Sequence, residues 1–294
     1  MAQAQIIDGR EVANNIREEI SEKMGELKSR GITPGLAVVL VGNDPASETY
    51  VRMKGRACEK MGIKEKTFTL PESTSQDELL ELVSQLNQDK TYHGILVQMP
   101  LPEQINPDVI IEALSPEKDV DGLHPTSMGR LVAGKAGFIP CTPHGILKLL
   151  EYYDLETDGK HAVVVGRSIL VGKPIANLLY QKNATGNATV TICHTHTDDL
   201  AQFTRRADIL IVAAGAPRAV TADMIKPGAV VIDVGINRVE DTSRERGYRL
   251  EGDVDFEKAQ KVAGYITPVP GGVGPMTITM LMQNTVWSAE RSRG

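Results

Sequence analysis

Two kinds of segment alternate along the chain and limit the folds it can adopt. Short runs rich in Val, Ile and Leu are predicted strands, and stretches in which apolar residues recur every three to four positions are predicted helices. The predicted strands cover residues 36–41, 66–70, 94–98, 161–165, 188–193, 208–213 and 229–234. Because strands that alternate with helices form parallel sheets with covered faces, the sequence predicts an α/β protein with mostly parallel sheets flanked by helices.

The length of 294 residues corresponds to about two domains at roughly 150 residues each. Residues 115–140 are rich in Gly, Pro and Asp and are predicted to connect the domains and help form the site. A final helix over residues 276–291 is predicted to return to the first domain. We therefore expect residues 1–141, completed by residues 273–294, to form one domain and residues 142–272 to form a Rossmann-like domain, with a cleft between them.

Charge and aromatic content exclude two classes of protein. The chain has 32 Lys and Arg against 38 Asp and Glu, a net charge of −6, whereas proteins that coat duplex nucleic acid need a basic surface. Only 4% of residues are aromatic, too few to indicate a platform that stacks single-stranded bases. No apolar run is long enough to span a bilayer. We expect neither a nucleic-acid partner nor a membrane partner.

Cysteine usage indicates the compartment. Cys58, Cys141 and Cys193 are odd in number and far apart, so they form neither a disulfide framework nor a metal knuckle. Residues 1–8 lack the basic and apolar sections of a signal peptide. The sequence therefore predicts a reducing, cytoplasmic location.

A turn between a strand and a helix, over residues 163–174, is the strongest local motif. Helix N-termini that follow such turns bind phosphates through free N–H groups. Five residues separate Gly166 from Gly172, one too many for a phosphate loop, and Pro174 stands where a magnesium-binding hydroxyl is needed. Ser168 stands where the dinucleotide fingerprint has glycine. We interpret the segment as an altered dinucleotide turn; a plain strand–helix turn is the alternative.

The next strand bears on which dinucleotide binds. An NAD site has a carboxylate at the end of this strand, which holds the ribose hydroxyls. Residues 189–193 are instead followed by His194, Thr195 and His196, with no carboxylate before Asp198. Arg167 and Thr195 suit a 2′-phosphate, so the sequence favours NADP. The two histidines alternate as metal ligands can, but no third ligand is evident and we expect no metal.

Three further features carry possible chemistry. Tyr50 and Lys54 are neighbours on one helix face, and burial in a pocket would lower the pKa of the lysine. A solvated surface pair is the alternative. Gln98 ends a predicted strand, at the edge of the sheet where ligands gather in parallel folds; the alternative is that it only caps a backbone group. Asp121 could hold a ring N–H group of a heterocycle, although acids beside a glycine also occur in simple turns.

The loop over residues 267–275 has three prolines and three glycines. Glycine permits close approach of the backbone to a ligand, and proline fixes the path of the chain. A rigid crossover between the domains is the alternative interpretation.

Seven segments occur in the order typical of one family. They are residues 50–54, 97–102, 118–122, 140–143, 166–168, 233–237 and 268–277. Together they closely resemble the bifunctional methylenetetrahydrofolate dehydrogenase/methenyltetrahydrofolate cyclohydrolase family over essentially the whole chain. The resemblance implies NADP-dependent oxidation of 5,10-methylenetetrahydrofolate to the methenyl cation and hydrolysis of that cation to 10-formyltetrahydrofolate. It also implies one-carbon metabolism that serves purine biosynthesis, tetrahydrofolate one-carbon derivatives as ligands, and a homodimer.

The resemblance implies roles for residues at matching positions. Lys54 resembles the acid–base lysine of the family, and Gln98 would hydrogen-bond to it and tune it. Tyr50 would pack on the folate and Asp121 would hold the pterin ring. The expected cofactor contacts are Gly166, Arg167, Ser168, Thr195 and Ile236, and the expected further substrate contacts are Pro270, Gly271 and Gly272.

Two other functions fit part of the sequence. A two-domain NADP-dependent dehydrogenase of a small acid or amino acid explains the turn at Gly166, as does an NADP-binding module without turnover. Both leave Lys54, Gln98 and the proline–glycine loop without a joint role.

Overall fold

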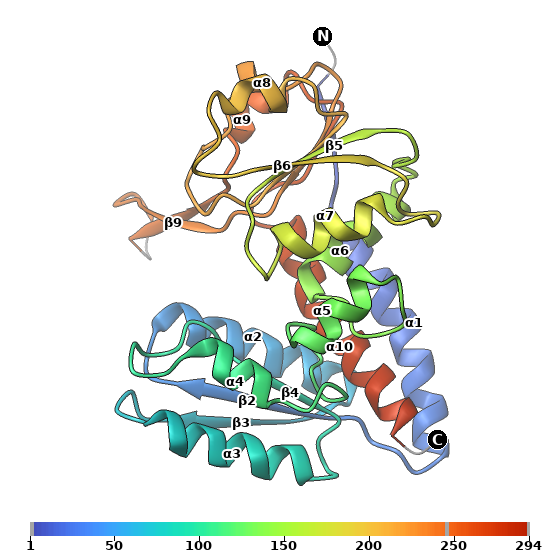
Figure 1. The fold of residues 1–294 in the computed structure, drawn as a ribbon, viewed down its shortest axis with the longest axis vertical. Helices are drawn as coiled ribbons and strands as arrows, with labels where there is room; N and C mark the ends of the chain where they lie inside the picture. Colours follow the sequence, from blue (N-terminus) through green and yellow to red (C-terminus); the bar gives the residue numbers. More distant parts are fainter. Residues whose placement is uncertain (1–2, 245–246, 293–294) are drawn as a thin grey trace. The chain divides into compact units, whose positions relative to one another are not determined.

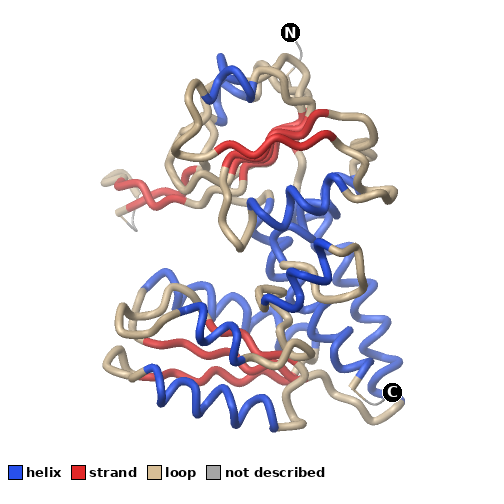
Figure 2. Tube along the Cα trace, viewed as in Figure 1, coloured by secondary structure: helices blue, strands red, loops and turns tan. Residues whose placement is uncertain are grey.

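The strands of the computed structural model, which describes residues 3–244 and 247–292, form two parallel sheets and a separate hairpin (Figures 1 and 2). Contacts divide the chain into two units. The six-stranded unit comprises the residues up to Asn14 together with Thr142–Thr277, and the three-stranded unit comprises Asn15–Cys141 together with the residues from Ile278 on. Both sheets are parallel, as the alternation of segments predicts. No helix within the described ranges is long and apolar enough to cross a membrane.

The six-stranded unit has a sheet in which all neighbouring strands are parallel. In spatial order its strands are β1 (Gln5–Ile6), β11 (Tyr265–Ile266), β8 (Val230–Asp233), β7 (Ile209–Val212), β5 (His161–Val165) and β6 (Thr189–Cys193). Val163, Leu210 and Val231 form its dry centre, with no exposed surface. The helices of the unit, apart from the ends of the two long helices that it shares, are α6 (Cys141–Tyr152), α7 (Gly172–Tyr180), α8 (Leu200–Thr204), the 3-10 helix η1 (Ala222–Met224) and α9 (Phe256–Ala259).

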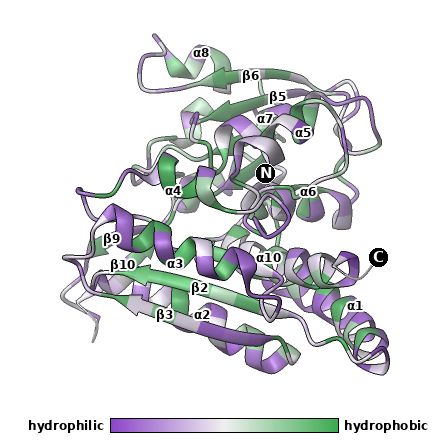
Figure 3. Cartoon of the chain, turned by 60° about the horizontal axis from the view of Figure 1, so that its bottom comes forward, coloured by the Kyte–Doolittle hydropathy of each residue, from purple (hydrophilic) through white to green (hydrophobic). Residues whose placement is uncertain are grey.

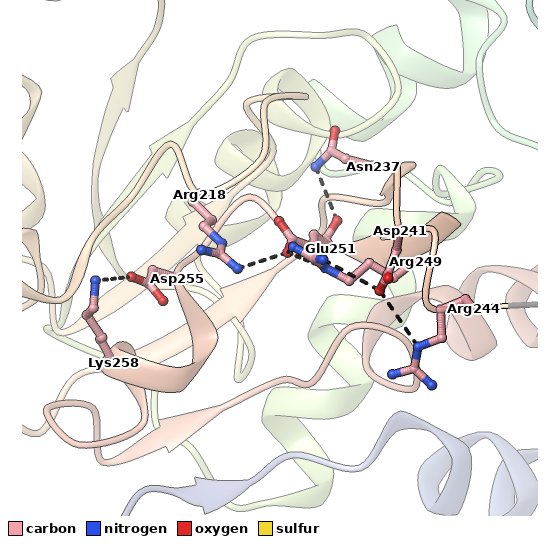
Figure 4. Close-up of polar contacts among 8 residues, drawn as sticks. All are labelled: Arg218, Asn237, Asp241, Arg244, Arg249, Glu251, Asp255 and Lys258. Carbon is pink, nitrogen blue, oxygen red and sulfur yellow. Dashed lines mark hydrogen bonds and ion pairs between the residues drawn. The ribbon is translucent and has the colours of Figure 1, made fainter. Parts of the chain in front are cut away.

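A charged hairpin lies outside this sheet and accounts for the polar stretch after β8. Its strands are β9 (Asn237–Glu240) and β10 (Tyr248–Glu251), which pair antiparallel. Glu251 accepts hydrogen bonds from Arg218 at 2.9 Å and from Arg249 at 2.7 Å, and Arg249 also pairs with Asp241 at 3.5 Å (Figure 4). The two arginine side chains are about half exposed, so each ion pair contributes little by itself. Together the pairs connect the hairpin to the loop that carries Arg218.

The three-stranded unit is built around β2 (Gly35–Val41), which lies between β3 (Lys64–Leu70) and β4 (Gly94–Val97). All seven residues of β2 are buried, and Figure 3 shows the strand as hydrophobic along its length. The helices of the unit are α2 (Pro45–Met61), α3 (Gln76–Gln88), α4 (Pro107–Ala113) and α5 (Pro125–Val132), together with most of α1 (Gly9–Ser29) and α10 (Val273–Arg291). In Figure 1, α2 and α3 lie on opposite sides of the sheet. A strand buried on both faces needs this arrangement.

Capping residues define both ends of α2. Asp44 accepts a hydrogen bond from the backbone N–H of Ser47 at 2.7 Å, and Pro45 occupies the first helical position. Gly62 ends the helix in the left-handed conformation, with φ of 72°. These caps fix the start of the helix and therefore the direction in which Tyr50 and Lys54 project.

The division into units differs from the domain bounds expected from the sequence. The residues up to Asn14 belong with the six-stranded unit because β1 pairs with β11, whereas the sequence predicts them in the first domain. The second boundary lies inside α10, at Thr277, and not at residue 272. The expected irregular stretch 115–140 also contains α5, whose N-cap is the ring nitrogen Nδ1 of His124.

Candidate active site

Lys54 and Gln98 form the centre of a polar group in the three-stranded unit. Lys54 projects from α2, one turn after Tyr50, and Gln98 follows the last residue of β4. The Lys54 Nζ donates a hydrogen bond of 3.0 Å to Gln98 Oε1. Both side chains are half-buried, so Lys54 is not the freely solvated surface lysine of the alternative interpretation.

The amide of Gln98 is held in one orientation. Its Nε2 donates to the carbonyl oxygen of Met99 at 2.7 Å, which leaves the side-chain oxygen facing Lys54. Its backbone N–H donates to the carbonyl oxygen of Val39 at 2.8 Å. This bond continues the backbone pairing of β4 with β2, so the strand itself sets the position of Gln98. Gln98 therefore meets both expectations at once, because its nitrogen satisfies a backbone group and its oxygen accepts from the lysine.

The surroundings of Lys54 favour the neutral amine. Burial lowers the pKa of the Lys54 ammonium below its ordinary value, and the negative charge of Asp121 opposes that shift. The thiols of Cys58 and Cys141 also lie near the amine. Burial raises the pKa of Cys58 to about 12 and that of Cys141 well above its ordinary value, so both thiols stay neutral. A lysine in this setting can accept a proton closer to neutral pH than an exposed one.

The two acids that precede Gly122 have different tasks. Asp119 is almost fully buried and accepts hydrogen bonds from the backbone N–H groups of Leu123 and His124, at 3.0 and 2.9 Å, and from Ser127 Oγ at 2.7 Å. Burial raises the pKa of Asp119 to about 6, although these bonds oppose the rise. Asp119 thus holds the turn into α5, as expected for an acid in a simple turn. Asp121 is half-exposed.

Helix α10 supports the turn at Asp121, a contact that the sequence analysis did not predict. Asn284 is buried, and its Nδ2 donates to the carbonyl oxygens of Val120 at 2.8 Å and Ile139 at 3.2 Å. Gly122 has φ of +75°, and a Cβ atom there would lie 2.6 Å from the Pro140 nitrogen. In the sequence Asn284 stands between Gln283 and Thr285, so no local pattern singled it out; its role follows from the rule that a buried amide is hydrogen-bonded.

The six-stranded unit carries a second group at the ends of its strands. Gly166 follows β5 with φ of +129°, and a Cβ atom there would lie 2.3 Å from the Ala213 carbonyl oxygen. A Cβ atom on Gly172 would lie 2.1 Å from the carbonyl oxygen of Gly166. Only glycine fits at either position, so the turn brings backbone close to backbone before α7 begins. Arg167 and Ser168 lie exposed in this turn.

Thr195 lies exposed in the turn after β6, beside two histidines. The backbone N–H of His196 donates to His194 Nδ1 at 3.2 Å, so this ring nitrogen already has a partner. Across the described ranges, no three His, Cys, Asp or Glu residues are grouped in a way that could hold a metal ion.

Two buried carboxyl groups shape the turn that presents Ile236. Asp233, at the end of β8, accepts hydrogen bonds from the backbone N–H groups of Gly235, Asp253 and Val254, at 2.9 to 3.0 Å. Burial raises the pKa of Asp233 to about 7, although the three N–H groups oppose the rise. Asp253 in turn accepts from Asn237 Nδ2 at 2.8 Å. Ile236 is left 41% exposed between these fixed points. Sequence reasoning missed this pair, because only the fold brings the two acids together.

The proline–glycine loop is packed against the start of α1. A Cβ atom on Gly9 would lie 1.8 Å from the Gly272 carbonyl oxygen, and Gly271 has φ of +117° with its Cβ position 3.3 Å from Arg10 Nε. The glycines therefore permit close approach of the chain to itself. Pro270 is exposed, whereas Gly271 and Gly272 are buried.

The expected site residues fall into two groups. Tyr50, Lys54, Gln98 and Asp121 belong to the three-stranded unit. The others belong to the six-stranded unit; they are Gly166, Arg167, Ser168, Thr195, Ile236, Pro270, Gly271 and Gly272. The first group can move a proton, and the second offers backbone N–H groups and a cation to a phosphate.

Comparisons with known proteins agree over the whole chain. Residues 7–121 match the catalytic domain of tetrahydrofolate dehydrogenase/cyclohydrolase, and residues 140–293 match its NAD(P)-binding domain. The bifunctional protein FolD of Moorella thermoacetica is 57% identical over 288 residues, covering 98% of this chain and 99% of that protein. The FolD structure from Campylobacter jejuni is 50% identical with a TM-score of 0.92, covering 98% of this chain and 99% of that one. The Trypanosoma brucei structure, complexed with NADP cofactor and inhibitor, is 42% identical with a TM-score of 0.94, covering 100% and 99%.

Proposed function

This chain belongs to the tetrahydrofolate dehydrogenase/cyclohydrolase family, and from that membership we propose how its own residues perform the two reactions. It is an NADP-dependent methylenetetrahydrofolate dehydrogenase and a methenyltetrahydrofolate cyclohydrolase of one-carbon metabolism. Membership of this family explains the Gly166 turn. The two alternative functions, dehydrogenation of a small acid or amino acid and NADP binding without turnover, are therefore not needed.

Hydrolysis of the methenyl cation needs a group that accepts a proton and gives it back. Neutral Lys54 takes a proton from the water that attacks the bridging carbon, and a C–O bond forms. Protonated Lys54 then supplies a proton to the ring nitrogen as its C–N bond breaks. The new hydroxyl group loses its proton to solvent as it becomes the C=O of the formyl group on the other nitrogen, so the overall reaction releases one proton. The observation that carries this role is the half-buried amine with a lowered pKa, 3.0 Å from Gln98.

A neutral Lys54 also suits the charge of its substrate. The methenyl intermediate is a cation, and a protonated lysine beside it would repel it. Burial keeps the amine uncharged for more of the neutral range, while Gln98 accepts its hydrogen bond without adding a negative charge. Tyr50 would pack on the folate, and Asp121 would accept hydrogen bonds from the pterin ring.

The turn after β5 fits a dinucleotide. Its two obligatory glycines open the backbone at the start of α7, where a Cβ atom on either would collide with the chain. Arg167 would bind the 2′-phosphate, with Ser168 and Thr195 as hydroxyl partners, and Ile236 would contact the nicotinamide end. When bound, NADP⁺ accepts the hydride from the one-carbon bridge. The residues of this chain contribute alignment to that step, because the product cation is stabilised by its own two nitrogens.

Substrate placement, assembly and location complete the proposal. We assign the folate to the group of Tyr50, Lys54, Gln98 and Asp121, whereas the substrate contacts expected of Pro270, Gly271 and Gly272 stay predictions. We also expect a homodimer, which sedimentation of the purified protein would detect. The three free cysteines are all buried, which is consistent with the reducing cytoplasm.

One assay tests the assignment of Lys54. Purified protein is mixed with methylenetetrahydrofolate and NADP⁺, and NADPH and the methenyl absorbance are followed together. Lys54→Met is expected to lose hydrolysis while binding of NADP⁺ stays nearly unchanged. Lys60→Met is the matched control, because Lys60 is an exposed lysine in the last turn of the same helix. Formation of 10-formyltetrahydrofolate by Lys54→Met at the wild-type rate would show that the lysine is not the acid–base group.

A further inference from the structure

A cavity of about 1080 Å³ lies in the three-stranded unit, away from Lys54 and Gln98. Its lining includes Lys64, the first residue of β3, and His93, which directly precedes β4. Because the strands are parallel, their amino ends share one edge of the sheet, and Gln98 follows the carboxyl end of β4 at the opposite edge. The cavity is therefore distinct from the site described above.

The charge of the lining contrasts with that of the chain. Five cationic side chains face one carboxylate in it, on a protein whose net charge is −6; they are Lys64, Lys90, Lys118, Arg130 and Arg291, against Glu117. Among the residues that the structure describes, none of the five cations forms an ion pair. Asp89 attracts Lys64 and Lys118 without contacting either in an ion pair. The positive charges in the lining outnumber the negative ones, and an excess of positive charge in a concave site attracts anions.

The walls of the cavity are fixed by hydrogen bonds. Lys118 Nζ donates to the carbonyl oxygens of Leu86 at 2.9 Å and Asp89 at 2.8 Å, and an ammonium group has a third proton to offer. Ser288 Oγ lies within hydrogen-bond distance of the carbonyl oxygens of His93 and Glu117, at 2.6 and 3.0 Å. These contacts join α10 to the amino ends of the strands, so hydrogen bonds within the chain hold the wall that carries the cationic groups.

An aromatic surface lies beside the charges. The rings of Trp287 and Phe138 meet edge to face with centroids 4.9 Å apart, and the Arg291 guanidinium lies 4.3 Å from the Trp287 ring centroid. This cation–π contact holds Arg291 against the wall. Trp287 is the one tryptophan in the sequence, so its fluorescence reports on this cavity alone.

We propose that this cavity is a second binding site, which takes a small oligophosphate. Compact lysine charges and the planar fork of arginine are the groups that bind phosphate oxygens in proteins. A volume of this size accommodates a small organic ligand. An inorganic oligophosphate and a nucleoside triphosphate share this chemistry, and only the second offers a ring to the Trp287 surface.

Fluorescence titration tests the proposal. The full chain, with saturating NADP⁺ to occupy the dinucleotide turn, is titrated with sodium tripolyphosphate and separately with ATP, while Trp287 emission is recorded. We expect a saturable change that weakens as salt is added, since the contacts are ionic. Tighter binding of ATP would indicate that the ring is recognised as well, and equal binding would indicate recognition of phosphate alone. No saturable change with either probe overturns the proposal.

Charge-removing variants locate the site. Lys90→Gln and Arg130→Gln remove cations at the wall and are each expected to weaken binding about tenfold, the loss of a charge-assisted hydrogen bond. Lys60→Gln, an exposed lysine of the same unit outside the cavity, is expected to bind as the wild type does. Circular dichroism of each variant verifies folding. Equal binding by the two wall variants and the control would place the ligand elsewhere and refute the assignment.

Discussion

The Lys54 amine and the Gln98 amide oxygen lie 3.0 Å apart, and Gln98 can present only this oxygen because its nitrogen is bonded to the Met99 carbonyl. The lysine therefore has a neutral acceptor beside it in a half-buried setting. A carboxylate in the same place would hold the lysine protonated.

Substitution of Gln98 by glutamate tests that relationship. We expect Gln98→Glu to raise the pKa of Lys54 and to lower cyclohydrolase activity at neutral pH by about tenfold for each pKa unit gained. The pH–rate profile measures the shift, which should move the rise in activity toward higher pH. Gln202→Glu changes an exposed glutamine of the other unit and should leave the profile where it is. An unchanged profile in Gln98→Glu would contradict the tuning role.

The wild-type enzyme should itself depend on pH in a defined direction. Burial lowers the pKa of Lys54, so the neutral form gains population below the ordinary lysine range. Hydrolysis is therefore expected to increase with pH and to level off below the pKa of an exposed lysine, about 10.4. Initial rates of loss of methenyl absorbance, corrected for the uncatalysed rate in buffer, provide the measurement. A rate that falls as pH rises through the same range would show that the charged lysine is the active form.

Arg167 is expected to select NADP⁺. Arg167→Ala removes an exposed cation from the turn after β5 and should raise the KM for NADP⁺ by about ten- to a hundredfold, the worth of hydrogen bonds to a charged group. The KM for NAD⁺, which lacks the 2′-phosphate, should change little. Arg206→Ala, an exposed arginine elsewhere in the same unit, is the control. Equal losses for the two cofactors would exclude a 2′-phosphate contact.

Asp233 should make stability depend on pH. Its pKa in the folded protein is about 7, above the ordinary 3.8, so folding favours its protonated form. The stability that it contributes is present in full below about pH 4 and is lost as pH rises through about 7. An asparagine at this position cannot titrate, and its amide N–H group would face a backbone N–H donor. The Asp233→Asn protein is therefore expected to be less stable than the wild type. The deficit should shrink by about 2 kcal/mol between pH 5 and pH 8 in urea unfolding; a constant deficit would mean that Asp233 does not titrate there.

Two glycine-to-alanine substitutions should have opposite effects on stability. A Cβ atom on Gly94, in β4, would lie 2.6 Å from Val120 Cγ1, and Gly94→Ala is expected to cost about 1–3 kcal/mol through overpacking. It should also lower activity, because β4 positions Gln98. Gly129 lies in α5 with nothing within 4 Å of its Cβ position, and Gly129→Ala should stabilise by about 0.5–1 kcal/mol. Thermal unfolding of both proteins measures the pair, and a stabilised Gly94→Ala would show that Val120 can move aside.

Features that depend on nearby residues could be predicted from the sequence. Asp44, Pro45 and Gly62 give the bounds of α2 because caps act over a few positions, and the apolar run over β2 identified a buried strand. The two-residue strands β1 and β11 show no periodicity, so their pairing could not be predicted. Helix α5 was also missed, because residues 125–132 include a proline and a glycine and have few apolar positions.

The candidate site, too, could be predicted only in part from the sequence. The spacing of Tyr50 and Lys54 and the strand end at Gln98 were readable, and the resemblance supplied the link between Lys54 and Gln98. Asp119 and Asp121 look equivalent in the sequence, and which of the two is buried could not be predicted. The turn into α5, a helix that was not predicted, places three donors from Leu123, His124 and Ser127 around Asp119.

The pairing of β1 with β11 has a consequence for how the protein is made. Gln5 in β1 pairs with Tyr265 in β11. Strand β1 is therefore synthesised long before the strand with which it pairs. The three-stranded unit likewise waits for the residues of α10 from Ile278 on. Neither unit can be completed during most of translation. The nascent chain therefore exposes unpaired sheet edges for longer than a chain of two consecutive domains, and unpaired edges promote aggregation.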